Sequence, residues 1–161
     1  MSKVKRWFVW SVMAGLLGGC DGLERFKVTP VDLTGQPLVG DWMGQAQLQQ
    51  GRMTVVQRLY ARIEARGVVT YVSLSCAFDS DSERSEASHL SLESVTVKRV
   101  TTQKMVLQNY PLTPQFELSI DSLPDASGQG FVLDQVPLSP ISSADKPSPE
   151  GWQCAELKAS L

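Results

Sequence analysis

The sequence predicts a mainly β domain, a small antiparallel β-barrel or β-sandwich of about seven or eight strands, tied by one disulfide. Short apolar segments of strand length recur from residue 38 onwards, and glycines and prolines separate them at fairly regular intervals. Residues 68–78 are rich in β-branched side chains, which favour strands. The chain shows no internal repeat and no heptad pattern, so neither a solenoid nor a coiled coil is expected.

The first expected strand begins near Leu38. Its apolar or small residues recur at every second position, which is typical of a half-buried strand: Trp42, Gly44, Ala46 and Leu48. Gln50 and Gly51 form a plausible turn after it.

Residues 52–66 fit two structures. As a strand, they place one apolar set on a single face: Met53, Val55, Leu59, Ala61, Ile63 and Ala65. As a helix, they form an apolar stripe, and the composition also favours helix: Val56, Leu59, Tyr60 and Ile63. We favour the strand because the alternation is longer than chance usually gives.

Residues 68–78 form the clearest strand. Five of its side chains face the same way: Val68, Val72, Leu74, Cys76 and Phe78. A disulfide at Cys76 is therefore expected on the core face of this strand.

The segment Asp79–Ser88 is a polar, acidic loop. Its oxygen-bearing side chains suggest calcium as an alternative to a solvated hairpin loop. An EF-hand needs glycine at its sixth position and glutamate at its twelfth, and this chain has Arg84 and Leu90 there. We therefore expect no metal.

Four further strands are expected over residues 90–100, 104–110, 115–122 and 131–136. Residues 137–151 contain four prolines and predict an irregular loop. The last segment, Trp152 to Leu161, returns Cys154 to the domain.

The N-terminus resembles a bacterial lipoprotein signal peptide. Three basic residues precede an uncharged apolar run over residues 7–17, which is shorter than the roughly 20 residues that span a bilayer. Leu17-Gly18-Gly19-Cys20 follows, and it resembles a lipobox. The resemblance implies cleavage between Gly19 and Cys20, acylation of Cys20 and anchoring in a bilayer.

This resemblance divides the chain into a signal peptide over residues 1–19, a flexible tether over 20–37 and a β-rich periplasmic domain over 38–161. Asp21 resembles the inner-membrane retention signal of enterobacterial lipoproteins. The expected location is thus a periplasm-facing membrane, with the inner membrane favoured and the outer membrane as the alternative.

Composition narrows the class of partner. The mature chain would carry 12 Lys and Arg against 17 Asp and Glu, a formal charge of −5. A mildly acidic domain fits nucleic acid poorly.

With Cys20 acylated, Cys76 and Cys154 remain, and an oxidising compartment predicts a disulfide between them. A catalytic or metal-binding cysteine is the alternative, although neither lies in a CxxC motif.

The search for reaction chemistry is mostly negative. His89 is the only histidine, which excludes a zinc site built on several histidines. No Gly-x-Ser-x-Gly elbow, P-loop or Gly-x-Gly-x-x-Gly is present. We expect His89 on the surface and no enzyme, no catalytic residue and no cofactor.

Gly40-Asp41-Trp42 resembles the first signature of lipocalins. In that family the tryptophan closes the base of the barrel, and a calyx binds apolar ligands, so the resemblance implies a barrel-base or ligand role for Trp42. The second signature, Thr-Asp-Tyr, is absent, and proline-rich sequence replaces the expected C-terminal helix. Plain core packing is the other interpretation of Trp42.

We therefore expect a lipid-anchored, non-enzymatic module that binds another envelope protein, as assembly factors, pilotins, inhibitors and immunity proteins do. The alternative is a lipocalin-like carrier of a small apolar ligand.

Overall fold

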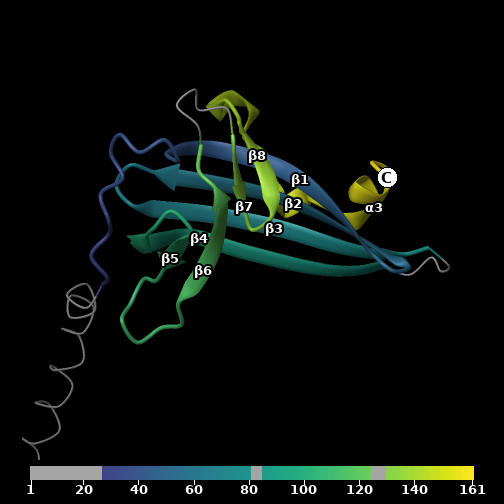
Figure 1. Ribbon diagram of the computed structural model, residues 1–161, viewed down its shortest axis with the longest axis horizontal. Coiled ribbons are helices and arrows are strands. Elements are labelled where there is room, and N and C mark those ends of the chain that lie inside the picture. The colour runs from purple at the N-terminus through teal and green to yellow at the C-terminus, as the bar shows by residue number, and fades with distance from the viewer. Residues whose placement is uncertain (1–26, 81–84, 125–129) are drawn as a thin grey trace, which may run out of the picture.

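A computed structural model describes residues 27–80, 85–124 and 130–161. Eight antiparallel strands follow one another around a closed barrel, in which β1 also pairs with β8 (Figure 1). The strands are β1 (Gly40–Gln50), β2 (Met53–Glu64), β3 (Val68–Asp79), β4 (Ser85–Val100), β5 (Lys104–Leu107), β6 (Phe116–Ser122), β7 (Phe131–Leu133) and β8 (Val136–Pro140). Two 3-10 turns, η1 (Ser143–Asp145) and η2 (Pro149–Gly151), and helix α3 (Cys154–Lys158) complete the described chain. The mainly β barrel prediction is confirmed.

The ambiguous stretch 52–66 contains a strand. β2 pairs with β1 from Met53 to Ile63 and with β3 from Met53 to Glu64. Leu59, Ala61 and Ile63 are buried in the main core, as the alternation predicts. Along β2, backbone N–H and C=O groups bond alternately to β1 and to β3. This pairing with two neighbouring strands outweighs the helical preference of the sequence.

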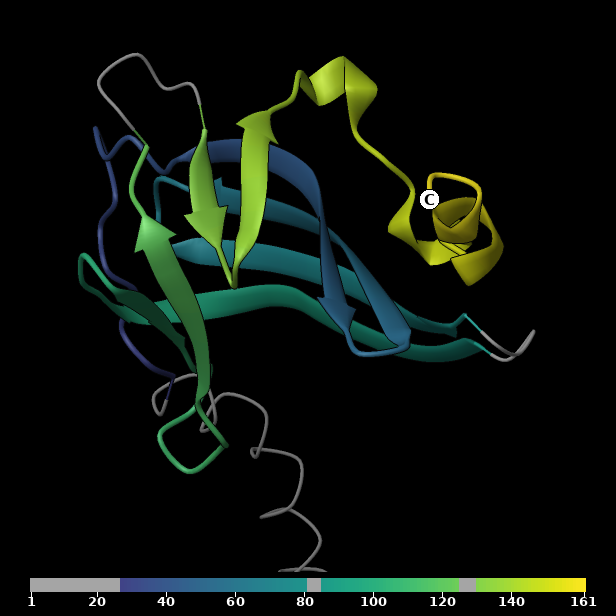
Figure 2. The same ribbon diagram turned by 45° about the vertical axis from the view of Figure 1, so that its right-hand side comes forward.

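The strands differ greatly in length. The first four have 11 to 16 residues, whereas β5 to β8 have three to seven. Figures 1 and 2 show the consequence: the β1–β2 and β3–β4 hairpins extend well beyond the short strands, away from the end where the described chain begins. The barrel therefore has one compact end and one sheet-like extension.

Packed side chains occupy the barrel interior. The main cluster unites both halves of the barrel, and its largest members are almost completely buried: Leu33, Trp42, Ile63, Tyr71, Met105, Leu107, Phe131 and Leu133. Leu33 lies ahead of β1, and Phe131 lies in β7. Alternation within single strands does not predict that these two residues share one core.

The chain before β1 belongs to the domain. The Val31 amide donates to the Val97 carbonyl (2.9 Å), and the Leu33 amide donates to the Ala65 carbonyl (2.7 Å). Leu33 and Leu38 are only 1% and 3% exposed. The tether expected over residues 20–37 is therefore shorter than the sequence indicates, because an isolated leucine in a proline-containing stretch shows no period that would reveal its burial.

The predicted loop over residues 137–151 begins instead as strand β8. Asp134 and Gln135 both have positive φ (48° and 64°), the geometry of a tight hairpin turn that joins β7 to β8. Such turns usually carry asparagine or glycine, so this sequence gave no signal for it. β8 then lies close against β1: a Cβ added to Gly44 would collide with the Pro137 carbonyl oxygen.

Cys76 is fully buried, but not in the barrel interior. It lies on the outer face of β3 in a second cluster with Val56, Leu74, Phe78 and Leu157 of α3. The expectation that these β3 side chains face the barrel core was wrong, since the interior receives Val69 and Tyr71 instead. A period of two separates two faces without saying which one a distant segment will cover.

Candidate functional site

The outer face of β1 to β4 carries a C-terminal strap, which we define as residues 141–161. Figure 2 shows it leaving the end of β8 and ending in α3 beside the long strands. The predicted disulfide holds it: the Sγ atoms of Cys76 and Cys154 are bonded, and their Cα atoms are 5.7 Å apart. Leu157 is completely buried beneath α3. Without the disulfide and this leucine, little apolar surface would retain a five-residue helix.

Arg58 of β2 links the strap to the sheet at a second point. Its Nη1 lies 3.3 Å from the Glu156 carboxylate, and its guanidinium lies 5.6 Å from the centre of the Trp152 ring. Its Nε and Nη2 also donate to the side-chain oxygen of Gln45 on β1. A planar guanidinium can make these contacts together because its donors form a fixed fork.

The strap and the sheet enclose a half-open hollow of about 410 Å³. Its sheet side comes from β2, β3 and β4, and its other side from the strap. The lining mixes polar and apolar side chains: Tyr60, Thr70, Val72, His89, Ser91, Glu93, Ser94, Lys146, Pro147, Ser148 and Pro149. We call this the outer hollow.

The polar groups of the outer hollow are well defined on its sheet side. The Tyr60 hydroxyl donates to the Asp41 carboxylate over 2.6 Å. Burial, and then this bond, raise the pKa of Tyr60, so the hydroxyl stays protonated at neutral pH. His89 is exposed, as the sequence predicts. The hollow thus offers hydroxyls, an imidazole and one charge of each sign.

A second hollow of about 450 Å³ lies on the other side of Pro147, which lines both. Met43, Gly44, Gln45, Arg58 and Trp152 complete its lining. The two hollows together flank the strap on the outer face of the barrel, and an extended chain could contact both.

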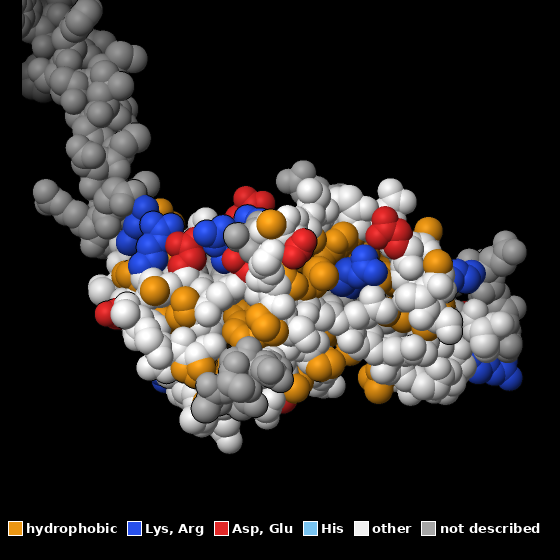
Figure 3. Space-filling view, turned by 90° about the horizontal axis from the view of Figure 1, so that it is seen from above, with side chains coloured by type: hydrophobic (Ala, Val, Ile, Leu, Met, Phe, Trp, Pro, Cys, Tyr) orange, Lys and Arg blue, Asp and Glu red, His pale blue; other side chains and the backbone are white. Residues whose placement is uncertain are grey.

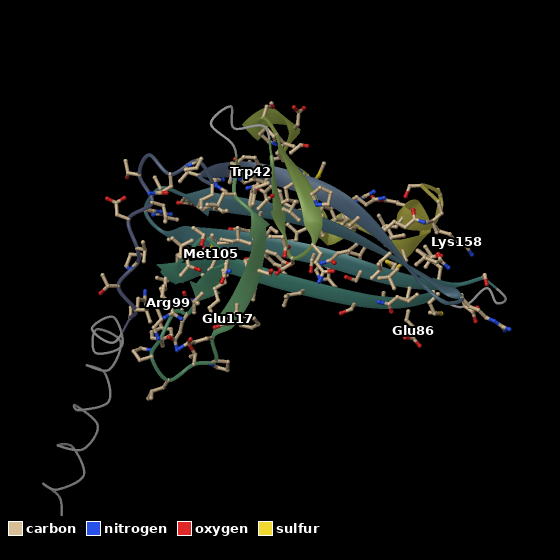
Figure 4. The ribbon with its side chains drawn as sticks, viewed as in Figure 1. Trp42, Glu86, Arg99, Met105, Glu117 and Lys158 are labelled. Carbon is tan, nitrogen blue, oxygen red and sulfur yellow. A yellow bond between two sulfur atoms is a disulfide. The ribbon has the colours of Figure 1, made fainter. Side chains whose placement is uncertain are left out.

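Trp42 lies inside the barrel. Its Nε1 donates to the Leu38 carbonyl over 2.9 Å, and its ring packs edge-on against Phe131 at 4.8 Å between centroids. Gly40 has a φ of 151°, a backbone conformation that favours glycine. The Gly-x-Trp spacing therefore has a local structural reason, and Figure 4 shows Trp42 among the side chains at this end of β1.

A polar pair joins the barrel core to the turn between β7 and β8. The Tyr71 hydroxyl donates to Oδ2 of Asp134 over 2.9 Å, while Oδ1 accepts from the Ser119 amide over 2.7 Å. Burial raises the pKa of Asp134, and these two bonds lower it in part. The carboxylate holds the positive-φ turn between β7 and β8, which is a structural role.

Other predicted residues lie outside the described chain. Gly19, Cys20 and Asp21 belong to these, as do residues 81–84 of the acidic loop. Residues 85–88 of that loop are part of β4. Among the described residues, no three His, Cys, Asp or Glu side chains are grouped so that they could hold a metal ion.

The sequence returned residues 152–161 to the domain through Cys154, but it predicted neither the path of residues 141–151 across the outer face nor the contacts of Arg58. The run Pro137 to Pro149 indicates only irregular backbone, and no local pattern tells which face it crosses. Trp152, an aromatic residue two positions before a disulfide cysteine, was the available signal.

No helix within residues 27–80, 85–124 and 130–161 is long and apolar enough to span a membrane. Comparison with models of known protein families, with curated proteins and with solved structures found no match.

Proposed function

We propose that this protein is a membrane-anchored lipoprotein that acts as a non-enzymatic protein-binding module in the bacterial cell envelope. Acylated Cys20 would attach it to the bilayer, and the outer hollow would bind a segment of another envelope protein. An assembly factor, pilotin, inhibitor or immunity protein would work in this way.

The observation that carries the proposal is the chemistry of the outer hollow. A carrier of apolar ligands needs a cavity that is mostly apolar. This hollow instead combines Tyr60, His89, Glu93 and Lys146 with two prolines and one serine from a covalently secured strap. Alternating polar and apolar groups fit a polypeptide, which has backbone donors and acceptors along its whole length.

The barrel topology supports a second candidate, a carrier of a small apolar ligand. Lipocalins are also eight-stranded up-and-down barrels, and Trp42 belongs to the main core cluster of this one. A ligand would have to displace packed side chains of the main cluster, so we place this candidate second.

Site-specific photocrosslinking tests the first candidate in native membranes. A benzophenone residue replaces His89, which is exposed and lines the outer hollow. The matched control replaces Gln103, which is exposed in the turn between β4 and β5. Each variant is also made with Cys20→Ser, which removes the anchor.

We expect one envelope protein to be crosslinked from position 89 and not from position 103, with a several-fold loss when Cys20 is replaced. Equal capture from both positions would refute binding at the outer hollow. Absence of protein adducts, together with a co-purifying apolar molecule, would favour the carrier. An unmodified Cys20 in the mass spectrum of the membrane-extracted protein would refute the anchor.

A further inference from the structure

We propose that residues 108–115, the loop between β5 and β6, form a membrane-docking tip that places Leu112 in the interface of the bilayer. This inference rests on the proposed anchoring through Cys20 and adds an orientation to it.

Leu112 is the most exposed large apolar residue of the described chain, at 99% of its full surface. Pro111 precedes it, and Pro114 follows two residues later. Phe116 at the base of the loop is 40% exposed. Tyr110, Pro114 and Phe116 also line a shallow hollow of about 300 Å³ beside the loop. Apolar side chains thus continue from the tip to its base.

Hydrogen bonds fix the loop in this shape. Gln108 is only 2% exposed, and its Nε2 donates to the carbonyls of Pro111 (3.1 Å) and Thr113 (2.7 Å). The Thr113 hydroxyl donates to the Tyr110 carbonyl. A buried amide that holds both sides of Leu112 keeps the leucine outside the fold. Presenting a leucine to water on a fixed loop is unfavourable unless something covers it.

The loop lies where the described chain starts. The Val28 amide donates to the Asn109 carbonyl over 2.9 Å. Figures 1 and 2 show the loop at the lower end of β5 and β6, close to the first described residues and away from the tips of the long hairpins. The loop and the N-terminal attachment therefore share one end of the barrel.

The length of chain before Val28 limits how far this end can be from the bilayer. Cys20 precedes Val28 by eight residues. Eight fully extended residues span at most about 29 Å, and a flexible chain of this length averages roughly 16 Å between its ends. An acylated Cys20 would thus hold the loop within reach of the headgroups.

The charges around the loop suit an anionic surface, although the mature chain is acidic overall. Lys98 and Arg99 are exposed on β4 at this end, and Figure 4 shows Arg99 near the first described residues. The Lys98 ammonium donates to the side-chain oxygen of Gln108, the residue that fixes the loop. The nearby Glu117 carboxylate is paired with Lys104 at 2.9 Å. Glu117 therefore balances the charge of Lys104 rather than the charges of Lys98 and Arg99.

A bilayer fits this surface better than a protein partner does. A stable protein interface buries at least about 1,000 Å², and one projecting leucine with a small apolar base is far narrower. Burial of apolar side chains in the interface and attraction of nearby basic residues to anionic lipids both strengthen binding to a bilayer that Cys20 already anchors.

The experiment measures the depth of residue 112 in the full-length lipidated protein. Leu112→Cys is labelled with a polarity-sensitive fluorophore, and Leu48→Cys, which is 51% exposed on the long β1–β2 hairpin, is the matched control. Both proteins are reconstituted in vesicles of phosphatidylethanolamine and phosphatidylglycerol, with and without brominated acyl chains. Mass spectrometry establishes acylation of Cys20 in each sample.

We expect a blue shift and severalfold quenching by brominated lipid at position 112, and neither at position 48. Acylated protein with a water-like signal at both positions would overturn the docking tip and leave the anchor intact. A label at 112 that is shielded in native membranes but not in vesicles would assign the tip to a protein and overturn the proposal. Protein without acylation would instead refute the proposed function.

Discussion

Removing the disulfide tests how the strap is held. The Cys76–Cys154 bridge closes a loop of 78 residues, and the loop-entropy relation then gives about 4.5 kcal/mol of stabilisation against the unfolded chain. With a urea m-value of about 2 kcal/mol per molar, that loss would lower the unfolding midpoint by roughly 2 M. The value describes the cross-link alone, and it applies when the contacts of Leu157 and Arg58 persist in the reduced protein.

Tryptophan fluorescence reports this loss at two places. Residues 20–161 contain two tryptophans, Trp42 inside the barrel and Trp152 in the strap. Single-tryptophan proteins, made with Trp42→Phe or Trp152→Phe, therefore follow barrel and strap separately. We expect reduction to release Trp152 at lower urea than Trp42, since the residues that pair β1 with β8 precede the part of the strap that the disulfide holds.

The Cys76→Ser/Cys154→Ser variant is the control. It should match the reduced native protein and show no response to reductant. Equal unfolding midpoints for both proteins in oxidising and reducing buffers would refute the reasoning. A variant less stable than the reduced native protein would show that packing of the thiols, rather than the covalent link, carries the effect.

Three further predictions concern packing and pH. Gly44→Ala should lower the free energy of unfolding by about 3 kcal/mol or more, the upper range for overpacking, because the added Cβ would collide with the backbone of β8. Gly151→Ala is the control: its Cβ would meet nothing within 4 Å, so thermal stability should change little. Leu157→Ala should lower the free energy of unfolding in urea by about 2–3 kcal/mol. Leu161→Ala, at a 53% exposed site, should change it by no more than about 0.5 kcal/mol. Similar losses at both sites would contradict the burial of Leu157 under α3. Burial raises the pKa of Asp134 in the folded state, so the unfolded state releases this proton first as pH rises from below 4. The native protein should therefore lose stability relative to Asp134→Asn over that rise, and a constant difference would argue against the raised pKa.

The proposed orientation and the proposed binding site are compatible. The docking tip lies at the end where the described chain begins, whereas α3 and the tips of the long hairpins lie at the other end (Figure 2). In the space-filling view of Figure 3, apolar side chains form several separate patches among polar ones. A hollow with mixed chemistry, rather than one broad apolar face, is thus the more specific feature of this surface.

Local patterns predicted which segments are strands, since strand formation follows from alternation and β-branching in neighbouring residues. β3 matches the prediction almost residue for residue, and β2 was correctly chosen over a helix. The turn at Asp134 and Gln135 was not predictable in this way. Its positive φ angles are stabilised by bonds from Ser119 and Tyr71, which are distant in sequence.

By itself, the sequence determined the β class and the existence of most strands, because both depend on residue type or on a period of two. It also predicted the pairing of Cys76 with Cys154, from the number of cysteines and the compartment that the N-terminal resemblance implies. Only the tertiary structure decided that the barrel closes through β8, that Leu33 belongs to the core and that Cys76 lies outside the barrel beneath a strap. Those outcomes depend on which distant segment covers each face of the sheet. A single strand presents two faces, and the partner that buries one of them is encoded elsewhere in the chain.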